Sequence, residues 1–90
     1  MYLKDRSYYF VWGKKHCPWC LKAVSLLQEQ ENCDVRVFDM QDNEETLQRV
    51  KENFNWPTIP VIFKITSSGE QAFIGGFTDL DKHLVEQNND

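Results

Sequence analysis

A pair of cysteines separated by two residues constrains this chain most, in the run Cys17-Pro18-Trp19-Cys20. It follows a continuously apolar stretch, Tyr8–Trp12, which predicts a buried strand. Pro18 suits a first helical turn, because its missing N–H would have no intrahelical partner there. Apolar residues then recur at helical spacing as far as about Glu29. The pattern therefore predicts a strand, a loop and a helix that begins beside the first cysteine.

This position has chemical consequences for the cysteine pair. A cysteine at a helix N-terminus faces unpaired N–H groups and the positive end of the helix dipole, which favour the thiolate, the nucleophile of disulfide exchange. We expect Cys17 to be the exposed nucleophile and Cys20, one turn along and more buried, to be the resolving thiol. Half a zinc site is the alternative. Zinc takes about four ligands, and Cys33, His16 and His83 show no second metal-binding spacing.

Length and composition predict one small domain over residues 1–90. With 41% apolar and 13% aromatic residues, the chain has enough apolar surface for a small core. Three cysteines cannot all pair, which argues against a disulfide scaffold. The first six residues lack the apolar segment of a signal peptide, and no stretch is long enough to span a bilayer. We therefore expect a cytoplasmic protein with no membrane partner.

The charge of the chain is unevenly distributed. Its net charge is −4 and it has no basic block, so we expect no nucleic-acid partner. Basic side chains nevertheless surround the cysteine pair, at Lys14, Lys15, His16 and Lys22. Such a cluster should stabilise a thiolate and attract an anionic substrate.

The remaining pattern completes an α/β arrangement. Val35–Asp39 is predicted as a second strand, after a turn at residues 32–34 that contains Cys33. A helix capped by Asp42 or Asn43 follows. The segments Val61–Ile65 and Gln71–Ile74 predict a hairpin, and a last helix is capped by Thr78 or Asp79. Residues expected to face the core from the three helices are Leu21, Val24 and Leu27; Leu47, Val50 and Phe54; and Leu80, Leu84 and Val85.

The order βαβ–αββα predicts a four-stranded mixed sheet with three helices on both faces, the thioredoxin-like fold. Three motifs on this frame resemble those of a dithiol glutaredoxin. Gly13–Cys20 is similar to the family's basic residue, two spacers and CP[YFW]C. Thr58–Pro60 is similar to its TVP, and Gly75–Leu80 to its GG-x-[ST]-D-[LF]. The resemblance covers residues 8–87, with Trp19 in place of the commoner tyrosine.

The resemblance implies a glutathione-dependent thiol–disulfide oxidoreductase. Cys17 and Cys20 would be catalytic and would form the redox disulfide, with glutathione as co-substrate and no metal. The implied glutathione-binding residues are Lys14, Trp19, Thr58, Ile59, Pro60, Gly75, Gly76, Thr78 and Asp79.

Each part of glutathione has an implied partner. A cis bond before Pro60 would present the Ile59 backbone to the cysteine part. The helix start at Thr78 and Asp79 would bind the γ-glutamyl end, and Lys14 the glycine carboxylate. A further contact from the second helix stays open between Gln48, Arg49 and others.

The expected partners are disulfide-bearing or glutathionylated proteins, with ribonucleotide reductase among the candidates, and we expect a monomer. Two other functions stay open. One is a redoxin that serves ribonucleotide reductase and is recharged by thioredoxin reductase. The other is a metal or iron–sulfur binding module, which Pro18 and the absence of a CGFS motif argue against. Cys33 is expected to be an idle thiol, His16 a spacer and His83 a surface or packing residue.

Overall fold

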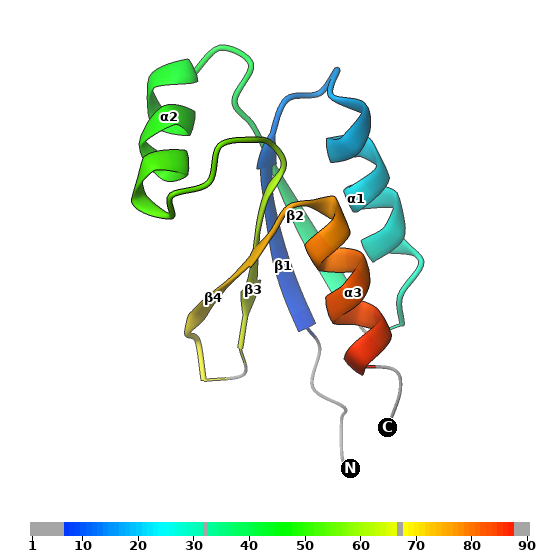
Figure 1. Cartoon of the computed structure of the whole chain (residues 1–90). Coiled ribbons are helices and arrows are strands. Elements are labelled where there is room, and N and C mark those ends of the chain that lie inside the picture. The colour runs from blue at the N-terminus through cyan, green and yellow to red at the C-terminus, as the bar shows by residue number, and fades with distance from the viewer. Residues whose placement is uncertain (1–6, 32, 67, 88–90) are drawn as a thin grey trace.

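The computed structural model describes residues 7–31, 33–66 and 68–87. Four strands and three helices follow one another in the predicted order (Figure 1). Their bounds are β1 Ser7–Gly13, α1 Pro18–Gln28, β2 Cys33–Asp39, α2 Glu44–Asn53, β3 Val61–Ile65, β4 Gln71–Gly75 and α3 Phe77–Gln87. Among the described residues, no helix combines the length and the apolar character needed to cross a membrane.

The four strands form one mixed sheet with the order β2-β1-β3-β4. β1 pairs in parallel with β2 and antiparallel with β3, and β3 and β4 form the predicted hairpin. Helices α1 and α3 lie on one face of the sheet, and α2 lies on the other (Figure 1). The predicted α/β architecture is confirmed, and the start of α1 lies at the end of the sheet where β1 ends.

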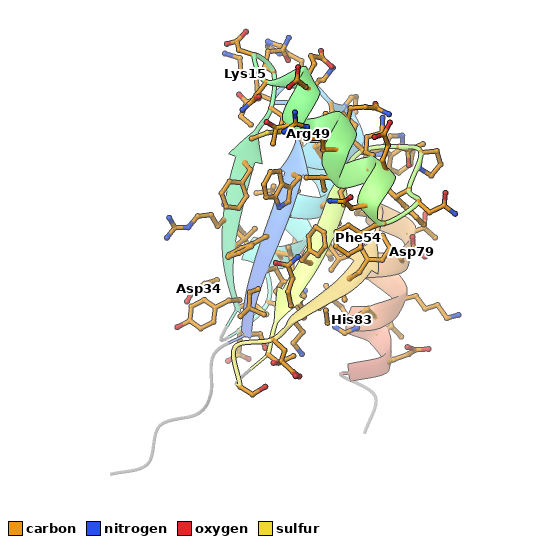
Figure 2. All side chains as sticks on the ribbon, turned by 90° about the vertical axis from the view of Figure 1, so that its left-hand side faces the viewer. Lys15, Asp34, Arg49, Phe54, Asp79 and His83 are labelled. Atoms are coloured by element: carbon orange, nitrogen blue, oxygen red, sulfur yellow. The ribbon has the colours of Figure 1, made fainter. Side chains whose placement is uncertain are left out.

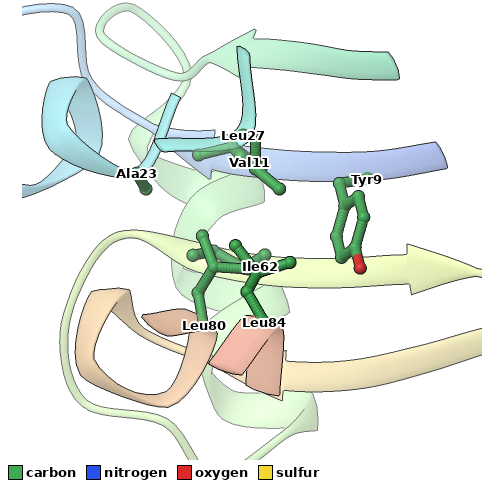
Figure 3. Packing of buried hydrophobic residues seen from close by; sticks show 7 residues of the cluster. All are labelled: Tyr9, Val11, Ala23, Leu27, Ile62, Leu80 and Leu84. Carbon is green, nitrogen blue, oxygen red and sulfur yellow. The ribbon is translucent and has the colours of Figure 1, made fainter. Parts of the chain in front are cut away.

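The main core lies between the sheet and the pair α1 and α3 (Figure 3). Alternate residues of β1 point into it, as the period of two of a strand requires. The buried cluster consists of Tyr9, Val11, Ala23, Leu27, Ile62, Leu80 and Leu84. Its apolar contacts hold α1 against β1 and so fix where the cysteine-bearing end of α1 lies.

The opposite face of β1 is only partly covered. Trp12 stacks on Phe38 with ring centroids 4.6 Å apart, and Phe10 meets Phe38 edge-on at 5.3 Å. Tyr8 is 47% exposed. The prediction of a fully buried strand is therefore wrong for this face, because α2 lies beside only the end of the sheet where β1 ends (Figure 1).

An aromatic cluster joins the end of α2 to the β3–β4 hairpin. Phe54, where α2 ends (Figure 2), stacks on Phe73 at 5.1 Å and meets Phe63 edge-on at 4.8 Å. Trp56 meets Phe73 at 5.4 Å. Between them Asn55 takes a left-handed conformation with φ of 52°, which asparagine tolerates better than most residues. These contacts anchor both sides of the turn that leads towards Pro60.

Several predictions about individual residues are wrong. Leu21 and Val85 were expected in the core but are 54% and 56% exposed. Their helical spacing from buried residues predicted an apolar face wider than the one that each helix buries. Cys33 begins β2 instead of lying in a turn, since parallel pairing with β1 extends the strand towards its N-terminus. Phe54 lies just beyond α2 and is 38% exposed, so it is not a core residue, although its ring contacts that of Phe63.

Candidate active site

Cys17 occupies the N-cap of α1. Its backbone is extended, with φ −87° and ψ 115°, and the helix begins at Pro18 as predicted. The Cys17 sulfur accepts the N–H of Cys20 at 3.3 Å, and the Cys17 N–H donates to the Lys14 carbonyl at 3.1 Å. Backbone N–H groups and the helix dipole at this end favour negative charge. The half-buried Cys17 sulfur is thus placed for thiolate chemistry.

Cys20 lies one turn further along and is 4% exposed. Burial, followed by its hydrogen bond with Cys17, raises the pKa of Cys20 to about 12. Cys20 therefore keeps its proton near neutral pH while Cys17 faces the helix N-terminus. The expected asymmetry in burial between the two thiols is present, but Cys17 is half-buried rather than exposed as predicted.

Gly13, the last residue of β1, lies directly against the buried thiol. A Cβ built at Gly13 would collide with the Cys20 sulfur and would come within 3.9 Å of the Pro60 Cα. The peptide bond between Ile59 and Pro60 is cis, as the resemblance implies. Absence of a side chain at Gly13 thus allows Cys20 and Pro60 to approach the same point.

The Gly75–Gly76 pair brings the start of α3 to this region. A Cβ built at Gly76 would lie 3.7 Å from the Pro60 carbonyl oxygen. Gly75 has φ of 124°, a left-handed conformation that favours glycine. The N–H of Gly76 donates to the Asp79 carboxylate at 3.0 Å. Three segments far apart in the sequence therefore meet around Pro60.

The predicted cap of α3 needs correction. The helix begins at Phe77, so Thr78 and Asp79 are the second and third residues of its first turn rather than residues before it. Asp79 reaches back to Gly76, the half of a capping box that an acidic residue at this position supplies. Both Thr78 and Asp79 are exposed and remain accessible to a ligand.

Similarly, the predicted cap of α2 is not formed through a side chain. Asn43 is the N-cap residue, but its side chain makes no capping hydrogen bond.

Two of the four basic residues have specific partners. The Lys14 ammonium lies 2.7 Å from a Glu44 carboxylate oxygen. The Lys22 ammonium lies 4.4 Å from the centre of the Trp19 ring, a cation–π contact. Trp19 is 52% exposed, and its ring centre is 5.6 Å from that of Phe77 at the start of α3. Lys15 and His16 are exposed. Lys15 lies at the top of the molecule in Figure 2.

The two second-helix candidates bond within α2. Gln48 donates to Glu52 at 3.2 Å, and Arg49 donates to Glu45 at 2.9 Å. Thr58 is exposed beside the half-buried Ile59. Across residues 7–31, 33–66 and 68–87, no three histidine, cysteine or acidic side chains are grouped closely enough to hold a metal ion.

Cys33 lies at the other end of the sheet. It pairs with Ser7, at the opposite end of β1 from Gly13, and six residues of strand at about 3.3 Å each separate the two ends by roughly 20 Å. His83 also lies far from the cysteine pair, where it bonds the Tyr9 hydroxyl at 3.2 Å. Burial, followed by the charge of Lys64, lowers the pKa of His83. His83 is thus a packing residue, as expected.

Sequence reasoning missed two residues at this site. Glu44 contacts Lys14, although the two residues are 30 positions apart. The indole edge of Trp56 lies beside Gly76, and its buried N–H has no hydrogen-bond partner. No local signal in the sequence indicates either contact.

Comparison with known proteins places this chain in a family. The sequence pattern of glutaredoxins matches residues 9–66. The chain belongs to the glutaredoxin family. It is 32% identical over 80 residues to an uncharacterized monothiol glutaredoxin of Porphyra purpurea, with 87% of this chain and 69% of that protein covered. Glutaredoxins are thiol–disulfide oxidoreductases, and this activity belongs to the chain as a family member.

Solved structures agree on the fold. Glutaredoxin 1 from Francisella tularensis superposes with a TM-score of 0.65 at 20% identity, with coverage of 93% of this chain and 99% of that one. A dithiolic glutaredoxin from Trypanosoma brucei brucei gives 0.56 at 27% identity, with coverage of 93% and 79%. The relatives thus include glutaredoxins described as monothiol and as dithiolic.

Proposed function

We propose that this glutaredoxin is a glutathione-dependent oxidoreductase that uses Cys17 as nucleophile and Cys20 as resolving thiol. The observation that carries the proposal is the asymmetry of the pair. The Cys17 sulfur accepts a backbone N–H at a helix N-terminus, whereas burial raises the pKa of Cys20 to about 12. Cys17 is therefore suited to act as the nucleophile, and Cys20 is suited to stay protonated until the resolving step.

Reduction of a glutathionylated protein needs only Cys17. Its thiolate attacks the glutathione sulfur, so that a Cys17–glutathione disulfide forms, the original disulfide breaks and the protein leaves as a thiolate that takes up a proton. A second glutathione, as thiolate, attacks the glutathione sulfur of this intermediate. Glutathione disulfide leaves and the Cys17 thiolate is restored. The protein sulfur is thus reduced at the expense of the free glutathione, whose sulfur is oxidised. The glutathione that the substrate carried stays at the disulfide level throughout.

Reduction of a protein disulfide also uses Cys20. Cys17 first forms a mixed disulfide with one protein sulfur and releases the other as a thiolate, which is protonated. Cys20 then gives up its proton and attacks Cys17, which releases the second protein thiolate and closes the Cys17–Cys20 disulfide. Two glutathione molecules reduce this disulfide in two exchanges and leave as glutathione disulfide.

The proposed glutathione site spans the segments that meet around Pro60. The Ile59 backbone would pair with the cysteine part of glutathione, like a short added strand. The exposed first turn of α3, at Thr78 and Asp79, would receive the γ-glutamyl carboxylate and ammonium. Gly75 and Gly76, which are buried against the side chains of Asp79 and Trp56, would contribute backbone alone to the site.

The other end of the proposed site is basic and aromatic. Lys14 would bind the glycine carboxylate, while Trp19 and Thr58 would border the thiol. We propose disulfide-bearing or glutathionylated proteins as substrates, ribonucleotide reductase among them.

A mechanism with Cys17 alone is the second candidate. The relative from Porphyra purpurea is described as a monothiol glutaredoxin, which favours it. In that mechanism Cys20 would be a structural residue under Gly13, and protein disulfides would not be substrates. The cysteine variants described in the Discussion separate the two mechanisms.

The reductant that the protein accepts distinguishes a glutathione-dependent enzyme from a redoxin recharged by thioredoxin reductase. The protein is supplied with NADPH, an excess of a protein-disulfide substrate, and either glutathione plus glutathione reductase or thioredoxin reductase alone. We expect sustained NADPH consumption only with glutathione, because the proposed site offers partners for a small anionic tripeptide. Efficient reduction by thioredoxin reductase, with none by glutathione, would overturn the proposal.

A further inference from the structure

The lysine proposed to bind glutathione is already paired with a carboxylate of the chain itself. Lys14 donates to a Glu44 carboxylate oxygen at 2.7 Å, a short charge-assisted hydrogen bond. The Lys14 side chain is 28% exposed and that of Glu44 is 66% exposed. Both side chains are therefore partly exposed, so the ion pair can open to solvent and a ligand carboxylate can reach Lys14 in place of Glu44.

The backbone holds Glu44 in this place. The N–H of Met40 donates to the carbonyl of Gly13 at 2.7 Å, next to Lys14. The N–H of Asn43 donates to the Met40 carbonyl at 3.0 Å, and α2 begins at Glu44. A carboxylate in the first turn of a helix is also favoured by the helix dipole. Two hydrogen bonds therefore link the start of α2 to the loop that carries Lys14.

The neighbouring carboxylate behaves differently. Glu45 pairs with Arg49 at 2.9 Å, one turn along the same helix. Its side chain is 83% exposed, so it has the same charge and a comparable environment. Glu44 and Glu45 thus form a matched pair in which only the first contacts the proposed ligand-binding lysine.

We propose that Glu44 is an internal competitor of the substrate carboxylate at Lys14. The inference rests on the proposed function, since it concerns the lysine assigned to the glycine carboxylate of glutathione. A glutathione-bearing substrate displaces Glu44 into solvent and replaces one ion pair by another. Because this exchange partly cancels the gain from binding Lys14, Glu44 weakens the binding of substrates with a carboxylate at this point. Substrates without that carboxylate are unaffected, so Glu44 sets the preference between the two classes.

The first measurement compares Glu44→Gln with Glu45→Gln, using the mixed disulfide of glutathione and 2-mercaptoethanol as substrate. Exposed ion pairs are weak, so we expect Glu44→Gln to lower KM roughly two- to fivefold with kcat unchanged. Glu45→Gln should change KM by less than about 1.5-fold, since the Glu45 carboxylate pairs with Arg49 rather than with Lys14 and is well exposed, so that its charge is screened. Equal effects of the two variants would overturn the proposal, because loss of the contact with Lys14 would then not be the cause. A higher KM for Glu44→Gln would also overturn it, because Glu44 would then be positioning Lys14 for the ligand.

The second measurement repeats the comparison with a substrate whose glycine carboxylate is converted to an amide, and in a Lys14→Met background. The effect of Glu44→Gln on KM should vanish in both cases, because either the competing carboxylate or the lysine is missing. An effect that persists in either case would contradict competition at Lys14. If wild-type protein does not turn over the glutathione mixed disulfide, the proposed function fails. If turnover is normal and Glu44→Gln is silent, only this inference fails.

Discussion

Replacement of Cys17 by serine is expected to reduce turnover of a glutathione mixed disulfide by more than about 1,000-fold. Serine keeps the size and the hydrogen bond from the Cys20 N–H, but its hydroxyl is not ionised at neutral pH and cannot form a disulfide. The measurement is steady-state turnover of the mixed disulfide with glutathione, glutathione reductase and NADPH. Residual turnover above a tenth of the wild-type value would exclude Cys17 as the nucleophile.

The other two cysteines are the matched controls for this substitution. Cys20→Ser should keep turnover of the mixed disulfide and lose reduction of a protein disulfide, because only the second reaction needs a resolving thiol. Wild-type protein that turns over the mixed disulfide but does not reduce a protein disulfide, with Cys20→Ser unchanged from it, would favour the mechanism with Cys17 alone. Cys33→Ser should change neither, since Cys33 pairs with Ser7 at the far end of the sheet.

Replacement of Gly13 by alanine should destabilise the fold by about 1–3 kcal/mol, the range for overpacking of a well-packed site. The new Cβ would collide with the Cys20 sulfur and lie 3.3 Å from the Cys20 Cβ. Gly13 is buried in the last position of β1, and strand pairing to β2 limits its movement. Urea or thermal unfolding of the reduced protein measures the loss.

Two further variants show whether the contact itself is responsible. In a Cys20→Ala background the sulfur is absent, so the added cost of Gly13→Ala should fall markedly, and the difference is the coupling between the two positions. Gly76→Ala should cost less than Gly13→Ala, because its Cβ would meet no atom closer than 3.5 Å. Equal costs for Gly13→Ala with and without the Cys20 sulfur would contradict the proposed collision.

The fold was predictable because its signals are local and regular. Alternating or continuous apolar residues predicted the strands, and Pro18 after Cys17 predicted where α1 begins. Errors arose where contacts with other helices or strands decide whether a residue is buried or belongs to a strand. Leu21 and Val85 have suitable spacing, but no element covers them enough to bury them. The local sequence around Cys33 indicates a turn, yet pairing with β1 makes Cys33 a strand residue.

The site was predictable to a different extent. The motifs predicted the candidate residues of the site, and the cis bond that they imply before Pro60 is present. They could not supply contacts between side chains far apart in the sequence, such as the ion pair of Lys14 and Glu44 or the packing of Trp56 beside Gly76. These contacts depend on where α2 lies relative to β1 and on how the turn after it is anchored, neither of which has a local sequence signal.

The central claim is that Cys17 carries glutathione as a mixed disulfide during turnover. The most direct test treats the Cys20→Ser variant with glutathione disulfide and measures the mass of the intact protein and of its peptides. Without a resolving thiol, we expect one glutathione per chain, attached to Cys17 and removed by added glutathione. An unmodified Cys17, or attachment at Cys33 in its place, would contradict the proposed mechanism.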